Sequence, residues 1–229
     1  MQVRQLIVCV TMTVNIQWLG HAGFMIENEV EKIFIDLYVS DEHKNSVNGP
    51  ASIYLISHGH RDHCHPESFN LVKTEDTIVI GTKGCAKSFD HEIHMISPDE
   101  ECNVRDVKIK SVHAYNTERF RSPGEPFHPK DYGCGFVIQI DGKTIYHAGD
   151  TGLISEMEQI GPVDVAMLPC GDTYTMDNVE AAEAAKIIKP RFVIPMHIRG
   201  IGISELRQML DEIHDIELVE MEVGDTFSI

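Results

Sequence analysis

The sequence lacks three features that would each point to a familiar class of protein. No run of 18 apolar residues occurs, and the apolar stretch at residues 6–10 is too short to span a membrane and has no convincing cleavage site. The six cysteines form no CxxC pair, which leaves a thiolate zinc site unsupported and predicts reduced, mostly buried thiols. Positive charge is scarce, with 19 Lys and Arg against 36 Asp and Glu.

The resulting net charge of −17 bears on the class of partner. Non-specific binding to nucleic acid depends on neutralising phosphates with Lys and Arg, so the sequence argues against general nucleic-acid binding. A cleft lined with divalent cations would still accept an anionic substrate. We therefore expect a cytoplasmic protein, without a membrane span, that acts on a small molecule, an anionic one included. Homo-oligomer formation is left open.

The composition is typical of a globular domain. With 42% hydrophobic residues, the 229-residue chain can bury a substantial core. Because no linker, repeat or low-complexity tract interrupts them, residues 13–229 are expected to form one domain. Residues 1–12 are expected to be an extension or a misassigned start, with Met12 as an alternative first residue.

Metal-binding side chains are concentrated directly after one predicted strand. The apolar run at 53–56 is rich in β-branched and aromatic residues and indicates a buried strand. It is followed by His58, His60, Asp62 and His63 in the pattern His-x-His-x-Asp-His. Side chains two apart in extended backbone point the same way, so His58 and His60 can bind one ion from one side. A polar loop that is merely rich in histidine is the alternative.

Three further residues follow predicted strands elsewhere in the chain. They are His113, Asp150 and His197. Each has an ordinary interpretation, because a single histidine at a strand end is commonly a polar surface residue and Asp150 could cap a helix. Thr151 could fill that capping role equally well and leave the Asp150 carboxylate free. As members of one set of strand-end ligands, all three become candidates for the metal site.

Together these residues predict a site for two divalent metal ions. His58, His60 and His113 would bind one ion, Asp62, His63 and His197 the other, and Asp150 would bridge them. Nitrogen and carboxylate ligands without thiolate favour zinc, with manganese or iron as alternatives. A hydroxide between the two ions would attack the substrate, and Asp62, His58 and His60 are the predicted catalytic residues. The residues expected to surround the ligands or contact substrate are His21, Asp36, Asn116 and His147.

The remaining pattern predicts alternating strands and helices. An Asp-Gly pair at 141–142 between two apolar runs predicts a hairpin. Helices are expected over 84–89, 152–157, 175–189 and 204–213. Residues 117–133 are expected to be a long loop that contacts substrate, because they concentrate basic and imidazole side chains in an acidic protein, namely Arg119, Arg121, His128 and Lys130.

Several motifs in order along residues 13–229 resemble one protein superfamily. They are Trp18-Leu19-Gly20-His21, the His-x-His-x-Asp-His stretch, Tyr146-His147-Ala148-Gly149-Asp150-Thr151, Tyr174-Thr175-Met176-Asp177 and Ile194-Pro195-Met196-His197. This set resembles the metallo-β-lactamase fold superfamily, and within it the branch of L-ascorbate 6-phosphate lactonase-like hydrolases. The resemblance implies an α/β (α+β) fold, a four-layer αβ/βα sandwich with a dinuclear site at the sheet edge.

The resemblance also implies a metal-dependent hydrolase of an ester, lactone or phosphodiester bond. The segment around His113 departs from the resembled pattern, which often has proline at that position. His60 stands where the di-iron flavoprotein relatives have glutamate, which argues against oxygen-reducing chemistry. Two other functions are retained as alternatives: a nuclease of the same fold, and a non-catalytic metal or ligand sensor.

Overall fold

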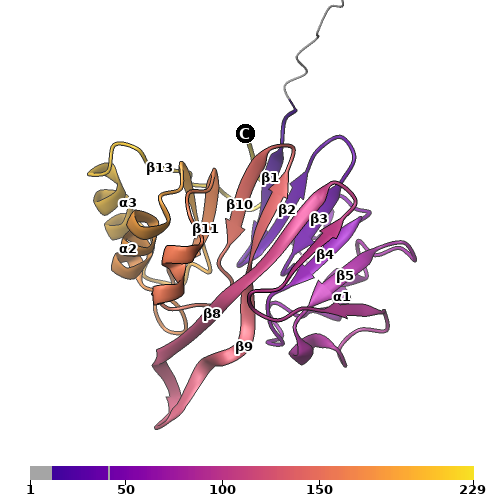
Figure 1. Ribbon diagram of the computed structural model, residues 1–229, viewed down its shortest axis with the longest axis horizontal. Coiled ribbons are helices and arrows are strands. Elements are labelled where there is room, and N and C mark those ends of the chain that lie inside the picture. The colour runs from indigo at the N-terminus through magenta and orange to yellow at the C-terminus, as the bar shows by residue number, and fades with distance from the viewer. Residues whose placement is uncertain (1–11, 41) are drawn as a thin grey trace, which may run out of the picture.

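The computed structural model describes residues 12–40 and 42–229 and contains two seven-stranded sheets packed face to face (Figure 1). The predicted extension at 1–12 lies outside the described residues apart from Met12. The five described cysteines are free, and four of them are buried, as expected. Within the described ranges, no helix is long and apolar enough to cross a membrane.

The first sheet is antiparallel at one side and parallel at the other. The chain pairs antiparallel from β14 through β1 and β2 to β3, and parallel from β3 through β4 and β5 to β6. In spatial order the strands are β14 (Thr226–Ser228), β1 (Asn15–Gly20), β2 (Gly23–Glu27), β3 (Lys32–Ile35), β4 (Ile53–Ile56), β5 (Ile78–Gly81) and β6 (Ile93–Met95).

The second sheet is also mixed. Its strands from β7 to β10 pair antiparallel, and those from β10 to β13 pair parallel. In spatial order they are β13 (Glu217–Leu218), β12 (Phe192–Met196), β11 (Val165–Pro169), β10 (Lys143–His147), β9 (Glu125–Ile140), β8 (Val107–Ser122) and β7 (Glu101–Val104).

Helices cover the outer faces of both sheets. Helices α2 (Asn178–Ile188) and α3 (Ser204–Asp211) pack outside the second sheet (Figure 1). The first sheet has a thinner cover, formed by α1 (Pro66–Phe69) and the single 3₁₀ turns η1 (Lys44–Ser46) and η2 (Lys83–Cys85). The predicted four-layer αβ/βα sandwich is therefore confirmed.

The alternation of side chains along β4 explains how this strand packs against apolar residues on both of its faces. Ile53 and Leu55 belong to the large core between the sheets, whereas Tyr54 and Ile56 pack in the smaller cluster on the outer face. The Phe69 ring of α1 lies 4.8 Å from the Tyr54 ring. Because successive side chains of a strand point to opposite faces, a continuous apolar run is what a strand buried on both faces requires.

The predicted loop at 117–133 is wrong. These residues form the ends of β8 and β9, two 16-residue strands joined by a tight turn at Pro123 and Gly124. The hairpin projects past the sheets at the lower left of Figure 1. Its outer part is exposed, so it carries no alternation of apolar residues that would have indicated strands.

The other element boundaries differ less from the prediction. The Asp141-Gly142 turn is present with both residues at positive φ, as a type I′ hairpin needs. The helix expected at 175–189 begins later, after a capping box of Asp177 and Glu180. The short helices expected at 84–89 and 152–157 are instead the 3₁₀ turns η2 and η3 (Ser155–Gln159).

Candidate metal centre

A cluster of imidazoles and carboxylates lies where several strands end. Strand β4 leads into the segment carrying His58 to His63, and β12 leads into His197. Strand β10 ends at His147, three residues before Asp150. The described chain offers three overlapping groups whose ligand atoms lie within 4.8 Å of one another. These groups are His58, His60 and His128; His21, Asp62, His63 and His197; and His58, His63 and Asp150.

Three imidazole nitrogens meet in the first group. His58 Nε2 and His128 Nε2 each lie 3.1 Å from His60 Nδ1. Two zinc–nitrogen bonds at a tetrahedral angle would place their nitrogens about 3.3 Å apart, so the spacing fits a shared cation. Burial, followed by the nearby His128, lowers the pKa of His60 to about 4. At neutral pH its ring is therefore uncharged and has a lone pair to offer a metal.

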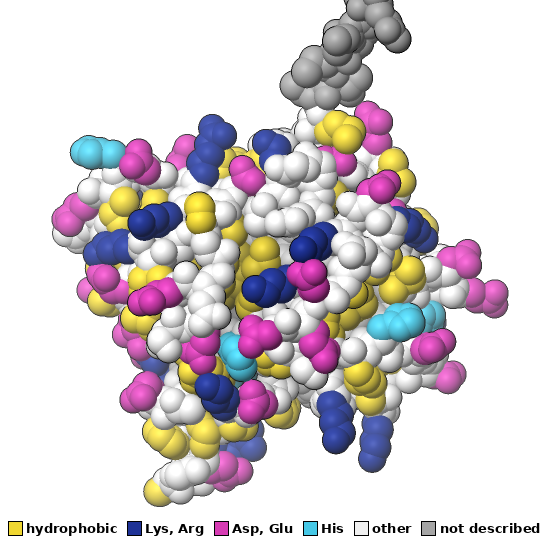
Figure 2. Space-filling model, in the orientation of Figure 1, with side chains coloured by type: hydrophobic (Ala, Val, Ile, Leu, Met, Phe, Trp, Pro, Cys, Tyr) yellow, Lys and Arg dark blue, Asp and Glu magenta, His cyan; other side chains and the backbone are white. Residues whose placement is uncertain are grey.

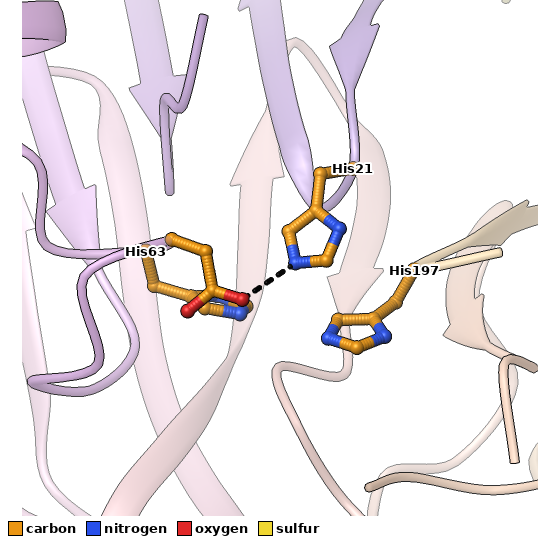
Figure 3. Close-up of side chains that lie close together, drawn as sticks. His21, His63 and His197 are labelled. Atoms are coloured by element: carbon orange, nitrogen blue, oxygen red, sulfur yellow. Dashed lines mark hydrogen bonds and ion pairs between the residues drawn. The ribbon is translucent and has the colours of Figure 1, made fainter. Parts of the chain in front are cut away.

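The second group gathers side chains from three distant segments. His21 in the β1–β2 turn, His63 after β4 and His197 after β12 face a common space (Figure 3). His21 Nε2 lies 3.1 Å from Asp62 Oδ2, within hydrogen-bonding distance, and its ring centroid lies 4.1 Å from that of His197. Burial alone would raise the pKa of Asp62, but the bond from His21 and the charge of His63 lower it, which keeps the carboxylate ionised.

Asp150 lies between the two groups. Its Oδ2 is 3.2 Å from both His128 Nε2 and His197 Nε2, and its Oδ1 is 3.3 Å from His63 Nε2. Burial opposes the charge of this carboxylate, but His63, His197 and His128 hold its pKa well below the usual range. Asp150 Oδ1 and His63 Nε2 are both buried without a hydrogen bond. A cation bound between Asp150 Oδ1 and His63 Nε2 would satisfy both atoms.

Asp36 fixes the orientation of His63. Its Oδ1 accepts the backbone N–H of Ser57 at 2.7 Å, and its Oδ2 lies 2.8 Å from His63 Nδ1 and accepts the Ser57 hydroxyl. A proton on Nδ1 directed at Asp36 leaves Nε2 free to bind metal. Burial disfavours a charged His63, but Asp150 and Asp36 outweigh that effect and raise its pKa well above the ordinary value.

Asn116 and His147 support the cluster from outside. The Tyr174 carbonyl accepts from Asn116 Nδ2 at 3.3 Å and lies 3.2 Å from His128 Nδ1, so it orients both side chains. His147 Nε2 lies 2.9 Å from the Ala22 carbonyl, and its Nδ1 accepts from the Gly149 N–H. His147 thereby connects the turn that carries Asp150 to the turn after β1.

His113 does not join the cluster. Its Nε2 lies 3.2 Å from Asp99 Oδ2, and its Nδ1 lies 3.9 Å from Asp131 Oδ1. Val112 and Ala114 are buried, so strand alternation turns the half-buried His113 to the opposite face of β8. The expected convergence of His113 with His58 and His60 is therefore wrong.

His128 takes the position that sequence reasoning gave to His113. It lies within β9 opposite Asn116, and its side chain is 4% exposed. It was recognised only as part of the basic segment 117–133, because it follows no apolar run. The signal that could have identified His128 is its pairing with Asn116 across β8 and β9. That pairing could not be predicted for a segment that was expected to be a loop.

A cavity of 310 Å³ opens beside the cluster. Five cluster residues reach its wall: His60, Asp62, His128, Asp150 and His197. The rest of the lining is three arginines, Arg61, Arg121 and Arg199, and two aromatic residues, Phe127 and Tyr174.

Sequence comparisons give one consistent result. Residues 15–197 match the family described as "Beta-lactamase superfamily domain". A "UPF0173 metal-dependent hydrolase" of Pelotomaculum thermopropionicum is 37% identical over 195 residues, which cover 80% of this chain and 83% of the relative. A protein of the same name from Methanosarcina mazei is 30% identical over 240 residues, covering 94% of this chain and 98% of the relative.

Solved structures agree with the sequence matches. A Parabacteroides distasonis protein described as a metal-dependent hydrolase has a TM-score of 0.83 and 28% identity, over 93% of this chain and 94% of that one. Igni18, a metallo hydrolase from Ignicoccus hospitalis, has a TM-score of 0.78 and 25% identity, over 95% of this chain and 98% of that one. The predicted metallo-β-lactamase fold is thereby confirmed.

Proposed function

Because this chain belongs to the metallo-β-lactamase superfamily, we propose that it is a metal-dependent hydrolase that cleaves an ester, lactone or phosphodiester bond of a small molecule. The observation that carries the proposal is the position of Asp150, whose carboxylate touches imidazoles of both ligand groups. A carboxylate shared in this way is suited to bridge two cations. The names of the relatives support hydrolysis, and the choice of bond rests on the sequence resemblance to lactonase-like hydrolases.

The geometry supports two ligand sets. His58, His60 and His128 would hold one divalent cation, Asp62, His63 and His197 the other, and Asp150 would contact both. When bound, such a pair supplies an activated water and polarises the bond under attack. Imidazole and carboxylate ligands favour zinc, with manganese or iron as alternatives.

Asp62 is the candidate for orienting the attacking water. Its side chain is 34% exposed and lies at the cavity, whereas that of Asp150 is 4% exposed and surrounded by imidazoles. The lowered pKa keeps Asp62 ionised at neutral pH, so its carboxylate can accept a hydrogen bond from the attacking water. The hydrogen bond from His21 holds this carboxylate in one orientation.

Alanine variants at two proposed ligands, with one control, test the ligand assignment. His128→Ala and Asp150→Ala are expected to lose bound metal, measured by elemental analysis of the purified protein, together with hydrolysis of chromogenic esters and phosphodiesters. His113→Ala is the matched control and should keep full metal content, because its ring contacts Asp99 on another face. Full metal stoichiometry in Asp150→Ala would refute the ligand set.

Turnover separates the hydrolase from a sensor that retains the fold. Metal-loaded wild-type protein should hydrolyse at least one member of the ester, lactone and phosphodiester panel, and Asp62→Asn should hydrolyse it far more slowly while still binding metal through the other ligands. A fully loaded wild-type protein that turns over no member of the panel would contradict the proposed chemistry.

A further inference from the structure

Two arginines beside the metal centre are held in place by a pair of aromatic rings. The Arg199 guanidinium lies 4.6 Å from the centroid of Tyr174, and the Arg121 guanidinium lies 5.7 Å from that of Phe127. The Tyr174 and Phe127 rings pack edge to face with centroids 4.6 Å apart. Cation–π contacts orient a guanidinium without using its N–H donors, so both forks remain able to bind a ligand.

The same aromatic pair is joined to the metal centre. The Tyr174 carbonyl orients His128, and Arg199 follows His197 by two residues. Arg199 Nη2 lies 3.8 Å from Asp62 Oδ2. All of these residues line the 310 Å³ cavity. A group bound by the two arginines would therefore lie in the same cavity as the bond under attack.

The arginine on the same arm of β8 as Arg121 has a different environment. Arg119 lies 2.6 Å from Glu180 and 3.2 Å from Asp172, with Asp177 at 3.7 Å, so its charge is already neutralised. The neighbour of Arg121 is one exposed carboxylate, Glu125, at 4.0 Å. Arg119 thus holds the hairpin against α2 through Glu180, whereas Arg121 presents its charge to the cavity.

The charge of the cavity is unusual for this molecule. On the face shown in Figure 2, Lys and Arg are interspersed with Asp and Glu, as expected of an acidic protein. In the cavity three arginines face two carboxylates, Asp62 and Asp150, and both carboxylates belong to the metal cluster. With cations bound, the cavity would carry a strong positive potential that attracts anions.

We propose that Arg121 and Arg199 form an oxyanion clamp for a phosphate or carboxylate group carried by the substrate. The clamp rests on the proposed hydrolase and adds the substrate class: an anionic organic molecule, with its charged group on the arginines and its scissile bond at the metal centre. The planar fork of Arg binds either kind of oxyanion through two parallel N–H bonds. Phe127 and Tyr174 offer an apolar surface for the organic part.

Binding of small probes to the metal-loaded, full-length protein tests the clamp without turnover. Phenylphosphonate, benzoate and neutral benzyl alcohol would be titrated by calorimetry. We expect wild type to bind at least one of the two anions at least tenfold more tightly than benzyl alcohol, and Arg121→Ala/Arg199→Ala to lose at least tenfold for that anion. Arg207→Ala, which removes an exposed arginine of α3 that pairs with Glu220, should match wild type.

The anion that depends more strongly on the two arginines identifies the group on the substrate. Lysine at both positions should restore part of the binding, because the charge returns without the fork. Equal binding of both anions by the double alanine variant and wild type would overturn the clamp, since the cations alone would then be holding them.

A kinetic measurement separates this inference from the proposed function. The ratio of kcat/KM for mono-4-nitrophenyl glutarate over neutral 4-nitrophenyl acetate should fall at least tenfold in the double alanine variant, mainly through KM. An unchanged ratio in an active enzyme refutes the clamp but leaves the hydrolase standing. If wild type hydrolyses nothing, the hydrolase fails, and the calorimetric result still decides whether the anion clamp exists.

Discussion

Asp36 illustrates how one buried residue orients a candidate metal ligand, His63. The side chain is fully buried, and its two oxygens accept from Ser57 and face His63 Nδ1. Its backbone is left-handed, with a φ of 45°, a conformation that Asp and Asn adopt more readily than most residues. The carboxylate is therefore aimed at the segment after β4 by the backbone itself.

Asp36→Asn should weaken both stability and metal binding. The Asn side chain has the same shape as Asp and adopts the same backbone conformation. One carboxylate oxygen is replaced by an NH₂ group, which cannot accept the hydrogen bond that the oxygen accepted. We expect a loss of about 1–3 kcal/mol in the free energy of unfolding, measured with urea. Metal affinity, measured by competition with a chromogenic chelator, should fall about tenfold to a hundredfold.

Asp99→Asn is the matched control for that substitution. Asp99 also has a left-handed backbone, with a φ of 69°, but its side chain is 64% exposed and contacts His113 away from the cluster. It should change neither quantity measurably. Equal metal affinity in Asp36→Asn and wild type would show that the orientation of His63 does not depend on this carboxylate.

At the same scale, the sequence predicted ligands where the local pattern was sufficient. His58 and Asp150 follow predicted strands, and the structure places them at one edge, with His58 Nε2 4.0 Å from Asp150 Oδ2. His128 could not be found this way, because its direction depends on the register between β8 and β9. A single strand-end histidine, His113, satisfied the pattern, yet alternation turned it outward.

At the scale of elements, β9 holds the ligand-bearing loops together through close backbone approaches. A Cβ on Gly135 would lie 2.8 Å from the His147 carbonyl oxygen and 2.9 Å from that of Ala148. A Cβ on Gly133 would lie 3.0 Å from the Cβ of His58. The strand thus passes against the segments that carry His58 and Asp150, and their separation depends on these glycines.

Gly135→Ala should therefore disturb the metal centre from a distance. The added methyl group meets backbone oxygens that cannot rotate away, so β9 or the 147–150 turn must move. Overpacking of this kind costs about 1–3 kcal/mol of unfolding free energy, and metal affinity should fall with it. Gly200→Ala is the control, because a Cβ there meets nothing within 4 Å and the residue has no positive φ. Equal metal affinity in the two variants would contradict this role of β9.

The elements predicted correctly are those whose conformation is determined by a short local residue pattern. The apolar run of β4 and the Asp141-Gly142 turn both carry their own signal. The outer hairpin of β8 and β9 does not, since its backbone pairing is satisfied between two exposed arms and no core face selects apolar residues. The site depends on that hairpin, which supplies Arg121, Phe127 and His128 to the cavity.

At the scale of the whole molecule, the candidate metal centre lies between segments that leave the two sheets. His58 and His63 follow β4 of the first sheet, whereas Asp150 follows β10 and His197 follows β12 of the second. A cation bound between them would contact segments from both sheets. These segments come together only in the folded state, so the cation is expected to bind and stabilise that state and not the unfolded chain. A ligand at a hundred times its Kd adds about 2.7 kcal/mol. For a chain of this length that corresponds to roughly 5–11 °C in Tm for each filled site.

The zinc-dependent gain in Tm should shrink as the pH falls. The raised pKa of His63 means that near neutral pH its ring carries a second proton, on Nε2, in the metal-free protein, and zinc must displace that proton to bind. Affinity therefore rises with pH and falls as the solution becomes more acidic. His60, whose pKa is lowered to about 4, is already neutral and adds little to this effect above pH 5.

Thermal unfolding with and without excess zinc, at pH 7.5 and at pH 5.5, measures this competition. We expect the gain at pH 5.5 to be less than half of that at pH 7.5, and calorimetry in buffers of different ionisation enthalpy to detect proton release on binding at pH 7.5. Removing Asp150 should abolish the gain at both pH values, because the carboxylate that raises the pKa of His63 also contacts both ligand groups. An equal gain at the two pH values would contradict the competition between zinc and a proton at His63.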